Sequence, residues 1–441
     1  MTEILPYLMF GALTFLLALG YPVAFTLGGI SLVFTAIGLG MDFQLFTLLP
    51  LRFWGRMTNF ILLAVPFFIF MGVFLEKSGI AEELLDIMAL IFGRLRGGVA
   101  ISIVMVGAVL AASTGIMGAT CITMGVISLP QMLKRGYQHE LATGTICASA
   151  TLGQIIPPSL SLILVADVMG VPVGDMYAGA IIPGLLLVGL YIFFLLIYSQ
   201  LRPQHAPGLS EAEAAQRDIR KLVWRVLTSL IPATCLIMAV LGTILFGMAS
   251  PTEAAAMGAF ATMILTIFYR RMSWTVLREV MYSTTRFCGM AFQIIFGATA
   301  FGLVFRGLGG DEAIKNLATK ISGGPWGIIF LCLVLIFLLG FFIDHIEITY
   351  IILPLLLPIL THFKIDLLWF CILVGMIFQT SFLTPPFGFA LFFLRGVAPK
   401  EVTTAEIYRG VWPWICLQLI GLACVLAHPP LATWLPKVIY K

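Results

Sequence analysis

TLGQIIPPSLSL, residues 151–162, places two consecutive prolines inside an apolar run that is long enough to cross a membrane. Because proline lacks a backbone N–H and its ring clashes with the carbonyl four residues earlier, the pair removes the helical partners of the Gly153 and Gln154 carbonyls. Unpaired carbonyls are costly in hydrocarbon, and irregular backbone at membrane depth is tolerated only beside protein or a water-filled cavity. The pair therefore predicts a broken helix beside an internal site.

The composition assigns the chain to the polytopic membrane proteins. Of its 441 residues, 60% are hydrophobic and 10% are charged, and the mean hydropathy is +1.06, which soluble domains of this length do not reach. The formal charge of +4 comes from basic residues gathered in a few loops, so it indicates orientation and not a nucleic-acid partner. Eight scattered cysteines without a Cys-x-x-Cys pair suggest neither zinc nor a disulfide framework. The first apolar segment lacks the charged start of a cleavable signal and is expected to be a retained span.

Apolar segments of about 20 residues mark the expected membrane helices. Two longer apolar stretches, 98–133 and 325–362, carry Gly, Ser, Thr or charge near their middles, which is typical of a hairpin that enters and leaves by one face. The polar segment 202–221 is predicted to link two halves. Single spans are predicted near residues 4–20, 22–40, 58–76, 140–169, 176–199, 223–247, 252–270, 288–306, 366–398 and 406–428.

The second half of the chain repeats landmarks of the first. QTSFLTPPFGFAL, residues 379–391, brings back the proline pair at an offset of 228, from Pro157 to Pro385. FMGVFLEKSGIAEELL, which begins at Phe70, aligns with AFGLVFRGLGGDEAIK, which begins at Ala300, at an offset of 230. Because these landmarks are polar or helix-breaking residues in the same order, they predict an internal repeat.

The distribution of Lys and Arg predicts how the repeats are oriented. Basic residues gather in segments 202–225 and 270–286, which places both segments in the cytoplasm. Counting spans from there, the first hairpin opens from the cytoplasm, the second opens from outside, and both termini are periplasmic. Each half then crosses the membrane five times, so the halves are inverted. Arg52 and Arg56 fall outside in this scheme, where residues 46–57 are expected to form an interfacial helix.

Inverted repeats with paired broken helices and opposed hairpins predict a secondary active transporter whose site lies where the repeats meet. Hairpin tips are expected within ASTGIMGAT, residues 112–120, and GFFIDHIE, residues 340–347. Ligation by oxygen atoms alone suits a hard ion such as Na⁺. The freed carbonyls, which are the candidate ligands, belong to Gly153, Gln154, Ser381 and Phe382.

More ordinary interpretations stand beside these. A proline pair can merely kink a helix, and small residues at a hairpin tip can merely allow close packing. In the SPTEAAAMG segment, a helix-starting capping box is the favoured interpretation of Glu253. Asp344, His345 and Glu347 are ionisable groups in a membrane-embedded hairpin, which favours a functional role, although a water-filled tip would also accommodate them. Asp167 either lines the pathway or reaches the outer interface.

Several motifs resemble the large membrane subunit of tripartite ATP-independent periplasmic (TRAP) transporters over essentially the whole chain: TLGQIIPPS, GMASPTEAAA, FLLGFFID, LTPPFGFALFFLRGVAP and VPFFIFMGVFLEKSGIAEELL. ASTGIMGAT and DHIEIT further resemble the branch labelled mannitol/chloroaromatic, which includes systems for 2-oxo acids. The resemblance implies an all-α, polytopic, inverted-repeat Na⁺ symporter of the elevator type, with two re-entrant hairpins and two broken helices, in the bacterial inner membrane. It implies no cofactor beyond the coupling ion. The implied partners are a DctQ-like small membrane subunit in a heterodimer, a periplasmic substrate-binding protein and a small organic anion, a carboxylate or sulfonate.

The resemblance also carries three groups of site residues onto this sequence. The first sodium site falls on Ser113, Thr114, Gly115, Gly118, Ala150, Thr151, Gly153, Gln154 and Pro157. The second falls on Gly340, Phe341, Asp344, Thr380, Ser381, Phe382, Thr384 and Pro385. The substrate, between them, is expected to meet Thr120, Ser159, Asp167, His345, Glu347 and Gly388.

The expected organisation alternates scaffold and transport segments. In the first half, scaffold helices with an interfacial arm are expected over 1–97, and a hairpin with a broken helix over 98–175. Scaffold helices with a second arm are expected over 176–324, and this segment includes the linker near 200–222. The second hairpin with its broken helix is expected over 325–400, and a last scaffold helix over 401–441.

Two other functions stay open at this stage. One is a stand-alone Na⁺-coupled carboxylate symporter that uses no binding protein, and neighbouring genes for a binding protein and a small subunit would argue against it. The other is an ion channel, which needs no alternating hairpins. An enzyme is not expected, because the chain has no HExxH, GxSxG or paired catalytic constellation.

Overall fold

The computed structural model describes residues 4–38, 40, 43–93, 95–114, 117–208, 219–319 and 324–440, and the regular structure in these ranges is helical. The first half contains α1 (Leu5–Ala18), α2 (Val23–Gly38), η2 (Phe43–Leu48), α3 (Leu49–Met57), α4 (Phe60–Lys77), α5 (Ile80–Phe92), α6 (Gly98–Thr114), α7 (Met117–Lys134), α8 (His139–Thr151), η3 (Leu152–Gln154), α9 (Leu160–Met169) and α10 (Val173–Leu201). The second half contains α12 (Ile219–Arg225), η4 (Val226–Leu230), α13 (Ile231–Leu245), α14 (Pro251–Phe268), α15 (Trp274–Gly307), α16 (Gly310–Thr319), α17 (Gly324–Leu339), α18 (His345–Glu347), η5 (Ile348–Ile352), α19 (Leu353–His362), α20 (Leu367–Leu383), α21 (Phe389–Val397), α22 (Thr404–Ala427) and α23 (Pro430–Ile439).

The predicted all-α membrane architecture is confirmed. Seven helices of the described chain are long and apolar enough to cross a membrane, and shorter apolar helices accompany them. Both broken helices lie where the proline pairs predict them, between α8 and α9 and between α20 and α21. The predicted hairpins are α6 with α7 and α17 with α18–α19. Most of the linker predicted over 202–221 lies outside the described residues.

The repeat extends to short helices that are not predicted as membrane spans. α5 follows α4 through Gly79 with φ 70°, and α16 follows α15 through Gly309 with φ 83°, so both halves use the left-handed conformation that glycine adopts readily. The residues after these glycines, Ile80 and Gly310, keep the offset of 230 found in the sequence. α3 and α23 are further helices too short for a span, and α3 lies in the segment predicted to be interfacial.

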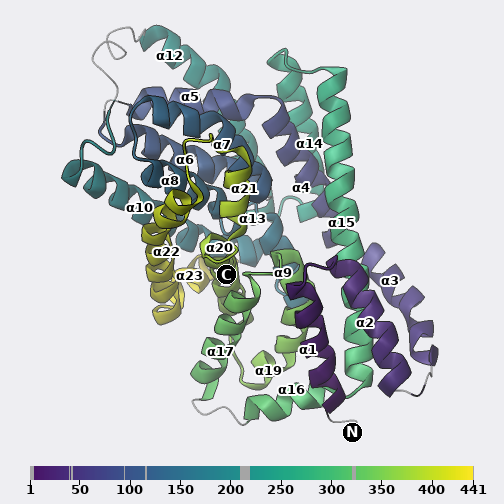
Figure 1. Cartoon of the computed structure of the whole chain (residues 1–441). Coiled ribbons are helices and arrows are strands. Elements are labelled where there is room, and N and C mark those ends of the chain that lie inside the picture. The colour runs from purple at the N-terminus through teal and green to yellow at the C-terminus, as the bar shows by residue number, and fades with distance from the viewer. Residues whose placement is uncertain are drawn as a thin grey trace.

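The helices pack into two groups. α15 packs against α2 and α4, and α4 packs against α14, which in turn contacts α13; we call α1–α4 with α13–α15 the frame. The two hairpins and two broken helices pack together with α10, α22 and α23; we call residues 98–201 and 324–439 the body. Figure 1 shows α14 and α15 of the frame on the right and α8, α10 and α22 of the body on the left.

A close helix crossing in the body joins α8 to α22 through two glycines. A Cβ atom on Gly144 would lie 2.2 Å from the carbonyl oxygen of Gly410, and a Cβ atom on Gly410 would lie 2.2 Å from the carbonyl oxygen of Glu140. At the same crossing the Gln418 amide donates to Thr151 Oγ1 at 3.1 Å and to the Tyr191 hydroxyl at 2.8 Å. α8, α10 and α22 are therefore joined by buried polar bonds as well as by packing.

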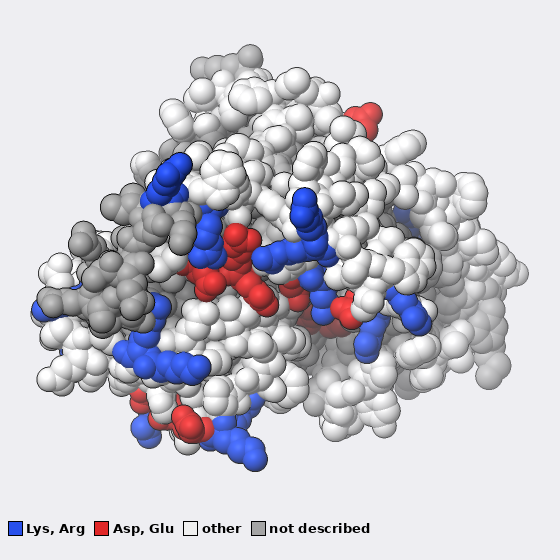
Figure 2. Space-filling model, turned by 90° about the horizontal axis from the view of Figure 1, so that it is seen from above, with Lys and Arg blue, Asp and Glu red and all other residues white. Residues whose placement is uncertain are grey.

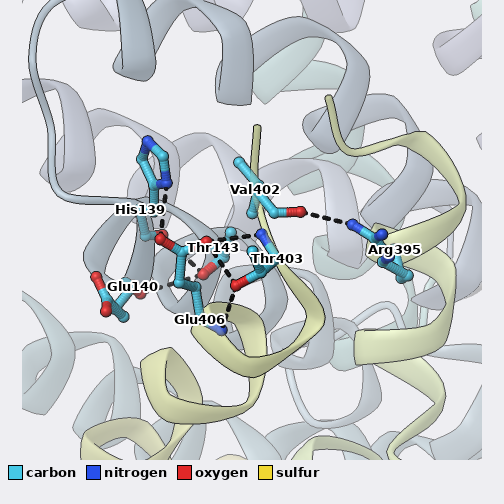
Figure 3. A network of polar contacts seen from close by, with 7 residues as sticks. All are labelled: His139, Glu140, Thr143, Arg395, Val402, Thr403 and Glu406. Atoms are coloured by element: carbon cyan, nitrogen blue, oxygen red, sulfur yellow. Dashed lines mark hydrogen bonds and ion pairs between the residues drawn. The ribbon is translucent and has the colours of Figure 1, made fainter. Parts of the chain in front are cut away.

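Figure 3 shows the polar contacts at the end of the body where α8 and α22 begin. His139 Nδ1 of α8 lies 3.0 Å from Glu406 Oε1 of α22. Glu406 also forms a capping box with Thr403, whose hydroxyl accepts from the Glu406 backbone N–H at 3.3 Å. Arg395 donates to the Val402 carbonyl at 2.6 Å, so the loop before α22 is held to α21 as well.

Valine at Gly144 is expected to prevent correct packing of the body. Its side chain would overlap backbone atoms of α22, which cannot rotate away, so the cost should reach about 3 kcal/mol, the upper end of typical overpacking effects. The measurement is the melting temperature and monodisperse yield of the purified complex. Gly189→Val is the matched control, because a Cβ atom on Gly189 of α10 would meet nothing within 4 Å. Equal stability of the two variants would contradict the close crossing.

Candidate functional site

The first broken helix ends α8 at Thr151 and restarts as α9 at Leu160. Between them lie a single turn over Leu152–Gln154 and a cis Pro157–Pro158 bond. The Gln154 carbonyl has no helical partner, because residue 158 is proline, and it accepts instead a hydrogen bond from the Ser159 hydroxyl at 3.2 Å. The side chain of Gln154 also accepts from the Ser161 hydroxyl.

The second broken helix shows the same plan with a different partner. α20 ends at Leu383, the Pro385–Pro386 bond is cis, and α21 begins after Gly388 in the left-handed conformation with φ 49°. The Ser381 carbonyl likewise has no partner four residues on, because residue 385 is proline, and it accepts instead from the Thr384 backbone N–H at 3.3 Å. Each carbonyl oxygen has two lone pairs, so one remains available at both breaks.

The threonine hydroxyls at the breaks are buried and donate to helical carbonyls. Thr151 donates to the Ala148 carbonyl at 2.8 Å. Thr380 donates to the Met376 carbonyl at 3.0 Å. Thr384 donates to the Thr380 carbonyl at 2.6 Å. Because each hydroxyl proton is used in this way, the lone pairs of Thr380 and Thr384 stay available to accept or to coordinate a cation, whereas Thr151 already accepts from Gln418 at 3.1 Å and keeps one lone pair.

The second hairpin tip lies directly on the second break. A Cβ atom on Gly340 would be 2.3 Å from Ser381 Oγ, so only glycine allows this approach. At the first tip, Gly115 lies outside the described residues, and the side chains of Ser113 and Thr114 are not described either. Gly118, just beyond that tip, would place a Cβ atom 2.8 Å from the ring of Phe393 on α21.

A cavity of about 490 Å³ lies where the hairpins, the breaks and the frame meet. Its wall includes Gly118 from the first hairpin and Asp344 and His345 from the second hairpin. Gln154 and Phe382 of the two broken helices also line it. Of the other predicted substrate residues, the cavity wall does not include Thr120, Ser159, Asp167, Glu347 or Gly388.

The frame supplies the opposite wall of the cavity, which sequence reasoning missed. Glu76 and Lys77 close the last turn of α4, and Phe287 and Met290 come from α15. Glu76 is held by the Thr123 hydroxyl of α7, which donates to it at 2.8 Å. The available signal was the charged pair at the end of the apolar run FILLAVPFFIFMGVFL, which ends a span but does not reveal the direction of its side chains.

The ionisable residues of the second tip form a compact network. His345 Nδ1 lies 2.8 Å from Asp344 Oδ1, and the Glu347 carboxylate accepts from the Asp344 backbone N–H at 3.2 Å. The second contact belongs to a capping box that starts α18, so Glu347 has a structural role there. The His345 ring lies near the rings of Phe378 and Phe382 on α20, with centroid distances of 6.1 and 5.9 Å. Asp344 and His345 are thus the members of this network that reach the cavity.

Asp167 contacts the frame instead of the central cavity. Its carboxylate accepts from Asn59 Nδ2 at 2.6 Å and lies 3.7 Å from Arg56 Nη1. Asn59 is the N-cap of α4, while Asp167 belongs to α9 of the body. This pair of contacts therefore bridges the frame and the body.

Comparison with known proteins gives a consistent result over the whole chain. The family described as "Tripartite ATP-independent periplasmic transporter, DctM component" matches residues 10–431. The chain is 27% identical to the C4-dicarboxylate TRAP transporter large permease protein DctM of Rhodobacter capsulatus, covering 98% of this chain and 99% of that one. It is 26% identical to the sialic acid TRAP transporter large permease protein SiaM of Vibrio cholerae, covering 98% of both.

Two further similarities bear on fold and length. The chain is 27% identical to the isethionate TRAP transporter permease protein DctMQ of Oleidesulfovibrio alaskensis, covering 94% of this chain but 64% of that longer protein. The crystal structure of the Alcanivorax borkumensis YdaH transporter, described as having an unusual topology, superposes with a TM-score of 0.62 at 17% identity, covering 97% of this chain and 98% of that one. At this identity the likeness concerns the fold alone.

Proposed function

This chain belongs to the DctM-component family of tripartite ATP-independent periplasmic transporters, and from that membership we propose that it couples Na⁺ entry to uptake of a small organic anion. Membership makes it a transporter permease subunit and not an enzyme. The observation that carries the proposal is the central cavity, which both hairpins, both broken helices and the frame enclose together. A site between inverted repeats at paired helix breaks is typical of secondary transporters.

The proposed sodium sites lie at the two breaks. Buried oxygens of Thr151 and Gln154 serve the first, and those of Thr380, Ser381 and Thr384 serve the second. Each region offers hydroxyl and carbonyl oxygens without nitrogen or sulfur ligands, which suits a hard cation. The close approach of a hairpin tip to the second break supports a site that forms from both segments.

The proposed motion is an elevator movement of the body along the frame. The packing favours moving α10 and α22 from the predicted scaffold segments to the body, because both pack on the broken helices and are joined by the buried Gln418 bonds. The frame contributes one wall of the cavity, so sliding the body would exchange that wall and the side from which the cavity is reached.

The proposed partners follow from the family. TRAP large permeases imply a small membrane subunit and a periplasmic binding protein, and we propose a DctQ-like subunit in a heterodimer with this chain. The additional length of the similar DctMQ protein is compatible with fusion of two such subunits. The exposed apolar side chains Leu51 and Trp54 of α3 are suited to a membrane or subunit contact at the interface.

The proposed location is the bacterial inner membrane with both termini periplasmic. Figure 2 shows the end of the molecule that carries α5 and α12, where acidic side chains lie between Lys and Arg. On this end Glu83 of α5 lies 3.2 Å from Arg271 and 3.7 Å from Arg225. An excess of basic residues in short loops favours the cytoplasm, which supports this orientation.

The proposed substrate is a carboxylate or sulfonate. The names of similar proteins mention C4-dicarboxylate, sialic acid and isethionate, which are all organic anions. In this chain Lys77 and His345 are the basic side chains in the wall of the central cavity, and both are suited to an anionic group.

Uptake by the reconstituted complex with its binding protein is expected to stop when Na⁺ is replaced by choline. Thr380→Val, which removes one oxygen and keeps the shape, should raise the half-saturating Na⁺ concentration about tenfold, the effect of one lost polar contact. Thr266→Val is the matched control, because the Thr266 hydroxyl of the frame is also buried and donates to a helical carbonyl, at 2.9 Å. Equal uptake in choline and sodium buffers would refute the sodium coupling.

A further inference from the structure

A second cavity of about 320 Å³ continues the line of the central one along α15. Phe287 and Ala291 of α15 line the central cavity, whereas Ala298, Gly302 and Arg306 line the second. Steps of four and seven residues keep all five on one side of the helix. The second cavity therefore lies farther along α15, with α3 and α15 of the frame on one side and η5 and α19 of the body on the other.

Three arginines face the second cavity, which we call the outer cavity because α3 lies on the predicted outer side of the membrane. Arg52 and Arg56 come from α3 and Arg306 from the end of α15. Arg306 has one exposed carboxylate, Asp311, at 3.9 Å, and such a pair contributes little. Within the described part of the chain, Arg52 has no carboxylate at ion-pair distance. The wall thus carries more positive charge than the protein neutralises.

One of the three arginines also contacts Asp167 of the body. Arg56 lines the outer cavity, and its Nη1 atom lies 3.7 Å from Asp167 Oδ2. Asn59 donates to the same carboxylate. Tyr350 of η5 also lines the outer cavity, and its buried hydroxyl has no hydrogen-bond partner among the described residues. A ligand that accepts hydrogen bonds would satisfy this hydroxyl and the arginines together.

We infer that the outer cavity is an anion-binding vestibule, in which Arg52, Arg56 and Arg306 receive the carboxylate or sulfonate of the substrate before it enters the central cavity. This inference rests on the proposed function. The arriving anion replaces Asp167 as the partner of Arg56, so its binding weakens a contact that holds the frame to the body. The same role explains why basic residues lie on the predicted outer side, against the general trend.

The test measures how charge controls access to a cysteine in the vestibule. Thr299→Cys, in the vestibule wall, is introduced into the complex in nanodiscs, and its labelling by anionic sulfonatoethyl and cationic trimethylammonioethyl methanethiosulfonate is followed by peptide mass spectrometry. Neutralising the three arginines to Gln should lower the ratio of anionic to cationic labelling about tenfold, and Lys at the same positions should restore it. Arg286→Gln is the control, because Arg286 lies on α15 outside both cavities. An unchanged ratio in the triple variant overturns the inference.

Two further arms separate the sources of the anion. Uptake from outside should show an apparent KM about tenfold higher in the triple Gln variant with an unchanged maximal rate. If phosphatidylglycerol blocks labelling by both reagents and phosphatidylcholine does not, the pocket holds a lipid headgroup, which overturns the vestibule. If the unmodified complex shows no Na⁺-dependent uptake, the proposed function is refuted. If the arginine variants show normal KM values, only this inference is refuted.

Discussion

Valine at Gly340 is expected to abolish Na⁺-dependent uptake while the complex still assembles. The Cβ atom alone would lie 2.3 Å from Ser381 Oγ and 2.7 Å from Ser381 Cβ, so the second hairpin tip has to move away from the second break. The proposed sodium site is built from both segments, so separating them removes its geometry. An overpacking cost of about 2 kcal/mol on the ion-bound state alone would weaken Na⁺ binding more than tenfold.

The measurement is uptake as a function of Na⁺ concentration, together with the assembly state of the purified complex. Gly396→Val is the matched control, because Gly396 also lies in the body and a Cβ atom on it would meet nothing within 4 Å. A Gly340→Val variant that keeps the normal Na⁺ dependence would show that the tip and the break do not form one site.

The helix breaks and the repeat could be predicted from the sequence because their signals are local. Each break has two consecutive prolines, which remove two backbone donors from one turn, whereas single prolines such as Pro66 and Pro183 stay inside helices here. Gly79 and Gly309 mark sharp turns at matching positions. The bonding of the freed carbonyls could not be predicted in the same way. Whether a given oxygen stays unpaired depends on a neighbouring donor whose direction is set by the turn.

The residues that form the cavity wall could not be predicted from the sequence. Glu76 and Lys77 read as the polar end of a span, and only the packing of α4 on the body directs them into the cavity. The crossing of α22 with α8 could not be predicted from the sequence, because Gly410 is ordinary in a membrane helix until its partner is known. The sequence of one apolar helix rarely indicates which other helix it packs against.

A covalent link between Asn59 and Asp167 is expected to stop transport. The two side chains form a 2.6 Å hydrogen bond between α4 of the frame and α9 of the body, so cysteines at both positions should be joined by a short bifunctional methanethiosulfonate reagent. A hydrogen bond contributes about 1 kcal/mol and can be exchanged during each cycle, whereas a covalent link cannot. If the body slides along the frame, linked protein should show only background uptake, and reduction should restore the level measured before linking.

The matched control links two helices of the body. His139 and Glu406, shown in Figure 3, are 3.0 Å apart on α8 and α22. Cysteines there should link as efficiently, and uptake should persist, because both helices move together in the proposed mechanism. Uptake that continues after complete linking of Asn59→Cys to Asp167→Cys would mean that the frame and the body do not separate at this contact, and the hairpins would then be static packing elements. Arrest by both links would instead place the moving boundary inside the body, between α8 and α22.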